Sequence, residues 1–559
     1  MTNYYDKSLG CYCPPKTASN TNQFKNAGYG IPGDPSRSAL KAFYASSNSP
    51  DYDTAPKVEG SRAFSRDTMM NTGPVPAIMR RMKTNVVGRG LKVQPEPDQD
   101  YLQSKGVADS VLLQFKADAK REFDLWAGKK TADSRGLMNF YELQALMLSS
   151  TFINGDTIYT LPWKKPLGTK NFPYETRVNL IEADLVRNPP EYGPDGATVS
   201  GKDIVMGVEM KQGEVFRYWV ANHYECDYLI NDSVKKFTPI NVRDSKGREQ
   251  IFIFALSERI GQRRGMPWLA PILEQVKMAS ILKESTLKAA LIQSFFSVMI
   301  SDPAGAQTTM QQAYTPENSF GGGGSYGPED AENIEAREEG WETNIEMGPG
   351  TVNYLGNKQV NFADPKRLDG AFKPFYDALM TEIAATCGIP REVVLLEFNK
   401  SYSASRAALL QAWKWFMECR ELLQANFCNP VYSSVIEEGI LKGRITAPGY
   451  FEDYAVREAW LNNEWTGDGM GAIDPEKETR AEVLSIQHRL STYKKEYNKH
   501  NSGNWSDAMH ELSEEKKLLK ELNIEVFEDS EELVGEDGIK DKKEGAADEN
   551  KSSNAKSKS

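Results

Sequence analysis

The spacing of apolar residues predicts helices in the first part of the chain and strands after them. Apolar side chains recur at a rough 3.6-residue period through residues 107–153, which is typical of amphipathic helix. Residues 156–256 instead alternate or run apolar between turn residues, so we expect a region rich in strands. Upstream, helical signals begin near Ser65, residues 76–82 predict a helix, and residues 86–93 predict a turn into a strand.

A long helix is predicted over residues 268–300, with Pro271 in its first turn. At 1.5 Å per residue it would span roughly 45 Å, which is long beside the usual helix of about 11–12 residues. Its polar positions are mostly basic. Lys277 and Lys288 are eleven residues apart and therefore fall on nearly one face.

A second helix is predicted over residues 365–388, because its apolar residues share one face, and Gly388-Ile-Pro390 ends it. A loop of about a dozen residues, 391–402, follows. Loops of that length inside a packed domain are usually functional. A third long helix begins near Ser403 and runs towards residue 439, where Pro430 can break it.

The segment between the first two long helices has a different character. Residues 301–361 hold four consecutive glycines and an acidic run around residues 335–342, and residues 348–362 predict a short hairpin. We therefore expect a compact insertion between two helices.

The two ends of the chain also differ from the middle. Residues 1–60 are rich in Ser, Asn, Gly, Pro and Tyr and predict an extended or partly disordered arm. Asp474 and Pro475 suit the start of a helix over residues 474–499, and a last helix is expected over residues 505–522. From Glu525 onward, eleven acidic and six basic residues with few apolar ones predict a disordered acidic tail.

Composition excludes several classes of protein. The 559 residues include 67 Lys and Arg against 78 Asp and Glu, a net charge of −11, which argues against a simple basic nucleic-acid binder. It remains compatible with a protein past which DNA must slide. Six cysteines without CxxC spacing and four scattered histidines fit neither a disulfide scaffold nor a zinc site. The longest nearly apolar run, residues 291–300, is too short to span a membrane, and the first residues do not resemble a signal peptide, so we expect a soluble intracellular chain.

No catalytic motif stands out. HExxH is absent from the sequence, and residues 350–358 lack the spacing and the lysine of a phosphate loop. We interpret Glu382, Glu392 and the acidic run as solvated or ion-paired groups, and His223 with Cys226 as core or surface residues. Trp413, Trp415 and Phe416 are interpreted as packing residues rather than a base-stacking platform. A carboxylate-dependent hydrolase stays open as an alternative and would require a concave pocket with perturbed carboxylates.

Several short motifs, collinear over about residues 62–522, give a more specific signal. Together they resemble the lambda-type family of bacteriophage portal proteins. Two departures are Ala404, where the YSSxR box usually has serine, and Asp156, where Gly-Glu is more usual. The matching segments are Arg66 to Asn71, Val86-Val-Gly-Arg-Gly90, Arg264-Gly-Met-Pro-Trp-Leu-Ala-Pro271, Lys288-Ala-Ala-Leu, Gly350-Thr-Val-Asn-Tyr-Leu, Phe372 with Phe375, Ile383-Ala-Ala, Gly388-Ile-Pro390, Tyr402-Ser-Ala-Ser-Arg406, Trp413, Trp460 to Trp465, and Ile473-Asp-Pro-Glu-Lys-Glu478.

The resemblance implies a mainly helical α+β portal fold that assembles as a ring, typically of twelve, around a DNA channel. The segments it implies are an arm (1–60), an α+β wing (61–265), stem helices (266–300 and 362–390), a clip (301–361), a tunnel loop (391–402), a long helix to the wing (403–445), wing and crown helices (446–524) and an acidic tail (525–559). The site residues it implies are Glu397, Asn399, Lys400 and Ser401 in the tunnel loop, Lys277 and Lys288 on the stem, and Glu335, Glu338, Glu339 and Trp341 in the clip.

The implied function is structural rather than enzymatic, with no cofactor, metal or membrane. Double-stranded DNA would pass through the ring during packaging and ejection. The terminase large subunit, head-completion or adaptor proteins, and major capsid and scaffold proteins would be partners, in the virion and, during assembly, in the host cytoplasm. A non-portal structural adaptor is a further alternative. For the stem lysines, ion pairs between subunits remain as open as a position in the channel.

Overall fold

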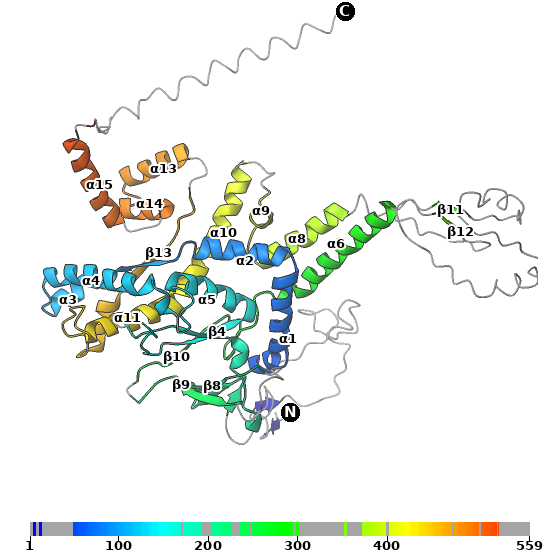
Figure 1. The fold of residues 1–559 in the computed structure, drawn as a ribbon, viewed down its shortest axis with the longest axis horizontal. Coiled ribbons are helices and arrows are strands. Elements are labelled where there is room, and N and C mark those ends of the chain that lie inside the picture. Colours follow the sequence, from blue (N-terminus) through cyan, green and yellow to red (C-terminus); the bar gives the residue numbers. More distant parts are fainter. Residues whose placement is uncertain are drawn as a thin grey trace, which may run out of the picture. The chain divides into compact units, whose positions relative to one another are not determined.

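The computed structural model describes residues 48–168, 172–192, 203–224, 235–245, 247–294, 372–397, 402–471, 475–501, 505–522 and 524, together with short strands at 4–6, 11–13, 298–300 and 352–354. Figure 1 shows the helices and strands of the chain, which divides into two compact units. Unit 1 consists of residues 1–61, 184–240 and 256–266, and unit 2 of residues 62–183, 241–255 and 267–559.

Unit 1 is built on a four-stranded antiparallel sheet in the order β6-β7-β8-β9. A small apolar cluster joins Ala55 and Val58 on α1 (Pro50–Asn71) to Val205 and Met206. Arg264 is buried and donates to the backbone oxygens of Val186 (2.7 Å) and Met206 (2.8 Å). Its guanidinium therefore holds the two backbone segments together. The strands are β6 (Asp203–Val205), β7 (Val208–Lys211), β8 (Glu214–Ala221) and β9 (Phe237–Asn241), with a separate pair β1 (Tyr4–Asp6) and β2 (Cys11–Cys13).

Unit 2 contains a three-stranded sheet in the order β10-β4-β5 and a two-stranded sheet of β3 and β13. β4 pairs antiparallel with both neighbours, with Ile158 opposite Ile253 and Ile181. Trp465 lies opposite Val93 in the smaller sheet, and both side chains are buried. The strands are β3 (Lys92–Pro95), β4 (Asp156–Thr160), β5 (Asn179–Ile181), β10 (Ile251–Ala255) and β13 (Asn463–Thr466).

An aromatic core fills unit 2 between the helices. Phe123 has its ring centroid 5.5 Å from each of Trp126, Phe140 and Tyr432 and 5.8 Å from Trp465. All five side chains are buried, and aromatic residues of this size dominate the energetics of a core. The helices that supply them or pack beside them are α2 (Pro74–Val86), α3 (Gln99–Ser104), α4 (Asp109–Ala127), α5 (Phe140–Asn154), α11 (Asn429–Leu441) and α12 (Tyr454–Leu461).

The remaining helices of unit 2 include α6 and α10, which have 22 residues each, as α1 does (Figure 1). They are α6 (Leu273–Ser294), α8 (Phe372–Thr386), α9 (Arg391–Leu395), α10 (Tyr402–Leu423), the π-helical turn η8 (Gln424–Cys428), α13 (Pro475–Gln487), α14 (Tyr493–His500) and α15 (Trp505–Glu521). Short 3-10 turns lie at η1 (Lys130–Ala132), η2 (Ala183–Leu185), η3 (Pro190–Tyr192) and η5 (Ala270–Ile272), and the strand pair β11 (Val298–Ile300) and β12 (Val352–Tyr354) is parallel.

Most of the helix and strand predictions are confirmed, and the errors have local causes. The predicted arm is wrong over residues 50–60, because α1 already begins at Pro50. Ser49 accepts from the backbone N–H of Tyr52, and Asp51 and Asp53 lie in the first turn, which together stabilise a helix start. The continuous helix over 107–153 divides into α4, η1 and α5, since Asn139 and Glu142 form a capping box that starts a new helix.

Three further boundaries differ from the prediction. The long helix ends at Ser294 rather than residue 300, and 298–300 form β11, where the β-branched Val298 and Ile300 favour a strand. Of the predicted hairpin over 348–362, only β12 lies among the described residues, and it pairs in parallel with β11. The helix over 474–499 divides at Arg489, whose φ is +59°, and Thr492 caps α14.

The predicted loop over residues 391–402 is partly helical, since α9 occupies its first five residues. The helix from Ser403 passes through Pro430 without ending. The π-helical turn at 424–428 absorbs the disturbance, and Pro430 lies in the first turn of α11, where its missing N–H costs nothing.

Candidate functional site

Two of the longest helices, α6 and α8, pack against each other (Figure 1). Each buries one side, through Val276 and Ala279 on α6 and Met380 and Ile383 on α8. Both helices also carry exposed apolar side chains. Met278, Ile281 and Leu287 on α6 and Phe375 on α8 are 51–59% exposed, although an exposed helix face is normally polar.

The exposed face of α6 also carries an ordered set of charges. Lys277, Ile281, Glu284 and Lys288 recur at helical spacing and therefore share this face. Lys288 Nζ lies 2.7 Å from Glu284 Oε1. The hydrogen bond and charge of Lys288, with a weaker attraction from Lys277, hold the pKa of Glu284 below its usual value. Lys288 is thus neutralised within its own helix, whereas Lys277 forms no ion pair within the part of the chain that is described.

The segment after α8 turns sharply at Gly388, whose φ is +66°. A side chain there would be strained by this backbone conformation, although an added Cβ would meet the Trp415 ring at an ordinary 3.5 Å. Arg391 then ties the start of α9 back to α8, with its Nη2 atom 2.9 Å from Asp377 Oδ1 and 3.8 Å from Glu397 Oε2. Leu396 ends α9 in the left-handed region at φ +57°. The segment beyond Glu397 therefore starts from a fixed base.

Helix α10, which follows this segment, is held at both ends. Near its start, Arg406 Nη1 lies 2.7 Å from Glu478 Oε1 on α13. Towards its end, the buried Arg420 guanidinium donates to the backbone oxygens of Val86 (2.9 Å), Asn85 (3.0 Å) and Asp468 (3.0 Å). Burial lowers the pKa of Arg420, and the Asp468 charge opposes this. These contacts fix α10 relative to α2 and to the strand–helix connection after β13.

A cavity of about 640 Å³ lies at the base of the same segment. Its walls come from the end of α8, from residues 388–392 and from one face of α10. Trp415 and Lys414 form part of the α10 wall. Trp413 and Phe416 instead pack, with ring centroids 6.4 Å apart and the Arg420 guanidinium over Trp413, as predicted for this cluster.

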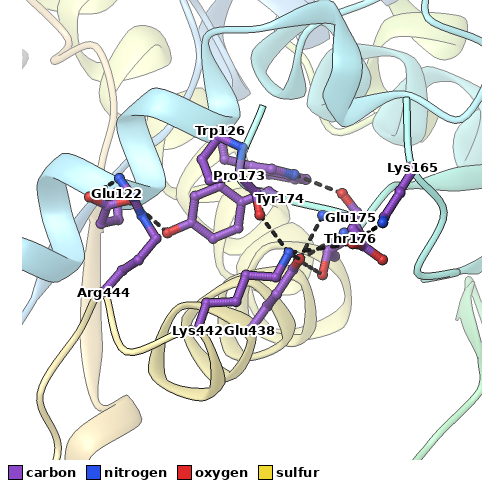
Figure 2. Close-up of polar contacts among 10 residues, drawn as sticks. All are labelled: Glu122, Trp126, Lys165, Pro173, Tyr174, Glu175, Thr176, Glu438, Lys442 and Arg444. Carbon is purple, nitrogen blue, oxygen red and sulfur yellow. Dashed lines mark hydrogen bonds and ion pairs between the residues drawn. The ribbon is translucent and has the colours of Figure 1, made fainter. Parts of the chain in front are cut away.

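Two buried carboxylates test the hydrolase alternative, because a catalytic acid or base needs a free atom at a cavity. Glu438 is completely buried and accepts from the backbone N–H groups of Glu175 (2.6 Å) and Thr176 (2.8 Å), from the Thr176 hydroxyl (2.6 Å) and from Lys442 Nζ (2.5 Å), as Figure 2 shows. These groups saturate the carboxylate. It joins α11 to the segment before β5.

The second carboxylate, Glu122, is bound as completely (Figure 2). It accepts from Arg444 Nε (2.6 Å) and Nη2 (2.8 Å) and from the Tyr174 hydroxyl (2.8 Å). Burial favours the neutral acid, but the hydrogen bonds from Arg444 and Tyr174 outweigh it and lower the pKa of Glu122. A general acid needs the opposite shift. Both carboxylates therefore hold elements together.

The described residues contain no cluster of metal ligands, and three free thiols among them are buried. They contain no cluster of three or more His, Cys, Asp or Glu side chains that could hold a metal ion. Cys387, Cys419 and Cys428 are buried free thiols, and burial raises the pKa of Cys387 and Cys419 to about 12, which suppresses thiolate formation. Over the same residues, no helix is long and apolar enough to cross a membrane.

Comparison with known proteins identifies the family. The family model described as phage portal protein, lambda family, matches residues 36–420, which include α6, α8 and most of α10. The chain belongs to the lambda family of phage portal proteins. The function expected from the resemblance, a portal protein at the capsid vertex, and its mainly helical α+β fold are thereby confirmed.

Individual portal relatives agree with this assignment. The chain is 23% identical over 487 residues to the portal protein of Escherichia phage N15 and 22% identical over 487 residues to portal protein B of Escherichia phage lambda, covering 84% of this chain and 86% of each relative. Among solved structures, the neck of an empty gene transfer agent particle is 12% identical, covers 79% of this chain and 94% of that chain, and has a TM-score of 0.35. That score is too low for any conclusion about how this chain is arranged.

The structure describes three of the predicted portal site residues. Lys277 and Lys288 share the exposed face of α6, and Glu397 lies beside Arg391 at the end of α9. The predicted tunnel-loop residues Asn399, Lys400 and Ser401 and the predicted clip residues Glu335, Glu338, Glu339 and Trp341 lie outside the described residues.

Sequence reasoning missed the residues that fix this region. Arg391 and Asp377 meet only because α8 and α9 fold together, and nothing local in the sequence pairs them. Arg420 is indistinguishable in sequence from a solvated arginine. Arg406 did carry a signal, because it belongs to the YSSxR box.

Proposed function

We propose that copies of this chain close into a ring, of about twelve, whose central channel passes double-stranded DNA during packaging and ejection. Membership of the portal family carries the proposal, since the match spans both α6 and α8. The exposed apolar side chains of these helices support it as well. A ring would cover them with the same helices of neighbouring copies, as heterologous interfaces that close do in cyclic assemblies.

The charges on α6 fit a channel that guides DNA without gripping it. B-DNA carries one negative charge per roughly 1.7 Å, so a channel lined heavily with Lys or Arg would resist movement. The chain is mildly acidic overall, and α6 neutralises Lys288 with Glu284. In the proposed ring, Lys277 faces the channel and contributes one ring of positive charge.

The segment 391–402 is proposed as the tunnel loop. Its base is fixed by Arg391 and by the anchors of α10, while Lys400 would reach the DNA. We extend the proposal to the segment 301–361 as the clip, docking first the terminase large subunit and then head-completion proteins. Major capsid and scaffold proteins would surround the ring, which would assemble in the host cytoplasm. The role is structural and not catalytic.

The decisive test is native mass spectrometry with negative-stain imaging of the purified chain. Closed rings with a central hole, near twelve copies, are expected. A chain that stays monomeric at high concentration, both alone and with capsid and scaffold proteins present, would contradict the proposal.

The tunnel-loop assignment has its own test. Lys400→Ala should leave rings intact and change the length of DNA packaged or the fraction retained. Lys283→Ala, at an exposed lysine on another face of α6, is the matched control. Packaging and retention that equal those of the control would refute the assignment of Lys400.

A further inference from the structure

The last three helices, α13 to α15, have no apolar core of their own. Within residues 475–501, 505–522 and 524, the only buried side chains are two carboxylates, Glu478 and Glu496. Polar contacts hold the helices to the rest of unit 2. Lys494 Nζ lies 2.8 Å from Glu464 and 3.5 Å from Glu96, and Lys120 pairs with Asp507 on α15. Exposed ion pairs contribute little, and helices this short need an apolar face packed against a partner.

Helix α15 displays such a face. Five apolar residues follow one another at spacings of three, four, seven and three residues. This spacing places them in one stripe along the helix. Helix α14 packs against α15, yet Leu512 remains 41% exposed and Leu522 59% exposed. The stripe consists of Trp505, Ala508, Leu512, Leu519 and Leu522, with Glu515 at the intervening position between Leu512 and Leu519.

The two flanks of this stripe carry opposite charge. By helical spacing, Lys516 and Lys520 lie on one side of it, and Glu511 and Glu514 lie on the other. All four are exposed, and within the described part of the chain none of them forms an ion pair. An apolar stripe with one basic and one acidic flank is complementary to a second copy of itself that points in the same direction.

We propose that α15 of one copy packs alongside α15 of the next copy in the ring, covering Leu512 and Leu522. The inference rests on the proposed ring, because rotation by one position about its axis keeps neighbouring helices nearly parallel and brings two different surfaces together. The basic flank of one helix then meets the acidic flank of the next. Glu511 lies beside Lys516 of the partner subunit. This five-residue offset is the one that parallel coiled coils use for ion pairs between helices.

Cysteine pairing tests this contact in the assembled full-length chain. The double variant Glu511→Cys/Lys516→Cys should form disulfides between neighbours on mild oxidation and give a ladder of multimers on a non-reducing gel. Within one helix the two positions are about 7.5 Å apart along the axis alone, beyond the roughly 7 Å a disulfide spans. The matched control is His510→Cys/Lys517→Cys, on the side opposite the stripe, which should give no more ladder than the wild-type chain.

The outcomes separate this inference from the ring itself. Rings that imaging shows to be intact, but that give no ladder above the control, overturn the α15 contact and leave the proposed function standing. Absence of rings counts against the proposed function instead. As a second measurement on intact rings, Leu512→Asp/Leu522→Asp should speed proteolysis within residues 475–522 about tenfold, since cleavage follows the opened population. Unchanged cleavage would overturn the contact.

If the acidic segment or DNA covered the α15 stripe instead, the experiments would give different results. If the acidic segment after residue 524 covered the stripe, removing that segment would raise cleavage as much as the aspartate variants do. If DNA covered it, added DNA would protect residues 475–522 in a salt-dependent way, without any ladder. Either result would overturn the proposal.

Discussion

The body of unit 2, which holds the aromatic core around Phe123, and the outlying helices α6, α8 and α13 to α15 differ in how they bury apolar side chains. Four aromatic rings pack around Phe123 within one chain, and both oxygens of each buried carboxylate in Figure 2 accept hydrogen bonds. On α6 and α8, by contrast, apolar side chains more than half exposed line the surface, and α13 to α15 bury no apolar side chain among the described residues. The body is complete in a single copy. The outlying helices would be completed by neighbouring copies in the proposed ring.

This difference predicts whether a mutation changes the stability of the single chain or its association with other copies. A change in the body should alter the stability of the single chain. A change on an outlying face should leave the single chain alone and alter association, because surface substitutions usually change stability by less than about 0.5 kcal/mol.

The largest effect is expected from Glu438→Ala. It would leave two backbone N–H groups, the Thr176 hydroxyl and the Lys442 ammonium without their acceptor in a buried site. Removing one partner of a buried charged network costs about 3–5 kcal/mol. Urea denaturation of the unassembled chain, followed by tryptophan fluorescence, measures this loss. Glu421→Ala, at an exposed glutamate of α10, is the control and should change little, and equal midpoints for the two variants would contradict the argument.

A smaller effect with a defined pH dependence is expected from Glu122→Gln. The folded chain holds the pKa of Glu122 below its ordinary value of 4.5, so the ionised form contributes stability above that pH and loses it as pH falls through the folded pKa. We expect a loss of about 1.5–3 kcal/mol near pH 7, and the difference from the wild-type chain should shrink as the pH falls below the ordinary pKa of 4.5. Urea denaturation across pH checks this. Glu249→Gln, in an exposed pair with Arg243, should show almost no difference at any pH.

The body was also the more predictable part from sequence. The stripe containing Phe115, Phe123 and Trp126 identified a buried helix face, and the alternation near β4 and β10 identified the sheet, because both patterns are local. Glu438 was not predicted, since a glutamate within a helix normally lies on the surface. Its acceptors are used by residues far away in the chain, and no local pattern records that.

The candidate site was predicted in outline, from family motifs, but not in its contacts. Lys277 and Lys288 fall on one face, as their spacing predicts. The neutralisation of Lys288 by Glu284 was within reach, since residues four apart on a helix are neighbours. The clasp between Arg391 and Asp377 and the parallel pairing of β11 with β12 join segments distant in sequence, so only the folded chain shows them.

A substitution on the exposed face of α6 should weaken ring formation while leaving the stability of the single chain unchanged. Ile281→Ser removes a half-exposed apolar side chain from α6, so the unfolding of the single chain should change by less than about 0.5 kcal/mol. The concentration needed for ring formation should rise about tenfold, equivalent to about 1.4 kcal/mol at each interface. Native mass spectrometry over a dilution series measures it. Leu113→Ser, at an exposed leucine of α4 in the body, is the matched control, and an equal change in that variant would contradict a specific role for α6.

The smallest effect on the protein is expected from changes at Lys277 and Lys288 of α6. These changes also test most directly which charge faces the channel. Lys277→Gln removes a charge with no partner among the described residues, whereas Glu284→Gln/Lys288→Gln removes a pair that is already neutral. Both changes should leave stability and ring formation unchanged. Retention of packaged DNA should then depend less on salt in Lys277→Gln rings only, because the slope of log affinity against log salt falls by about 0.9 for each phosphate that the protein no longer neutralises. A Lys277→Gln chain that fails to form rings would instead place Lys277 in an ion pair between subunits. A change in the double variant alone would show that Lys288 meets the DNA despite Glu284.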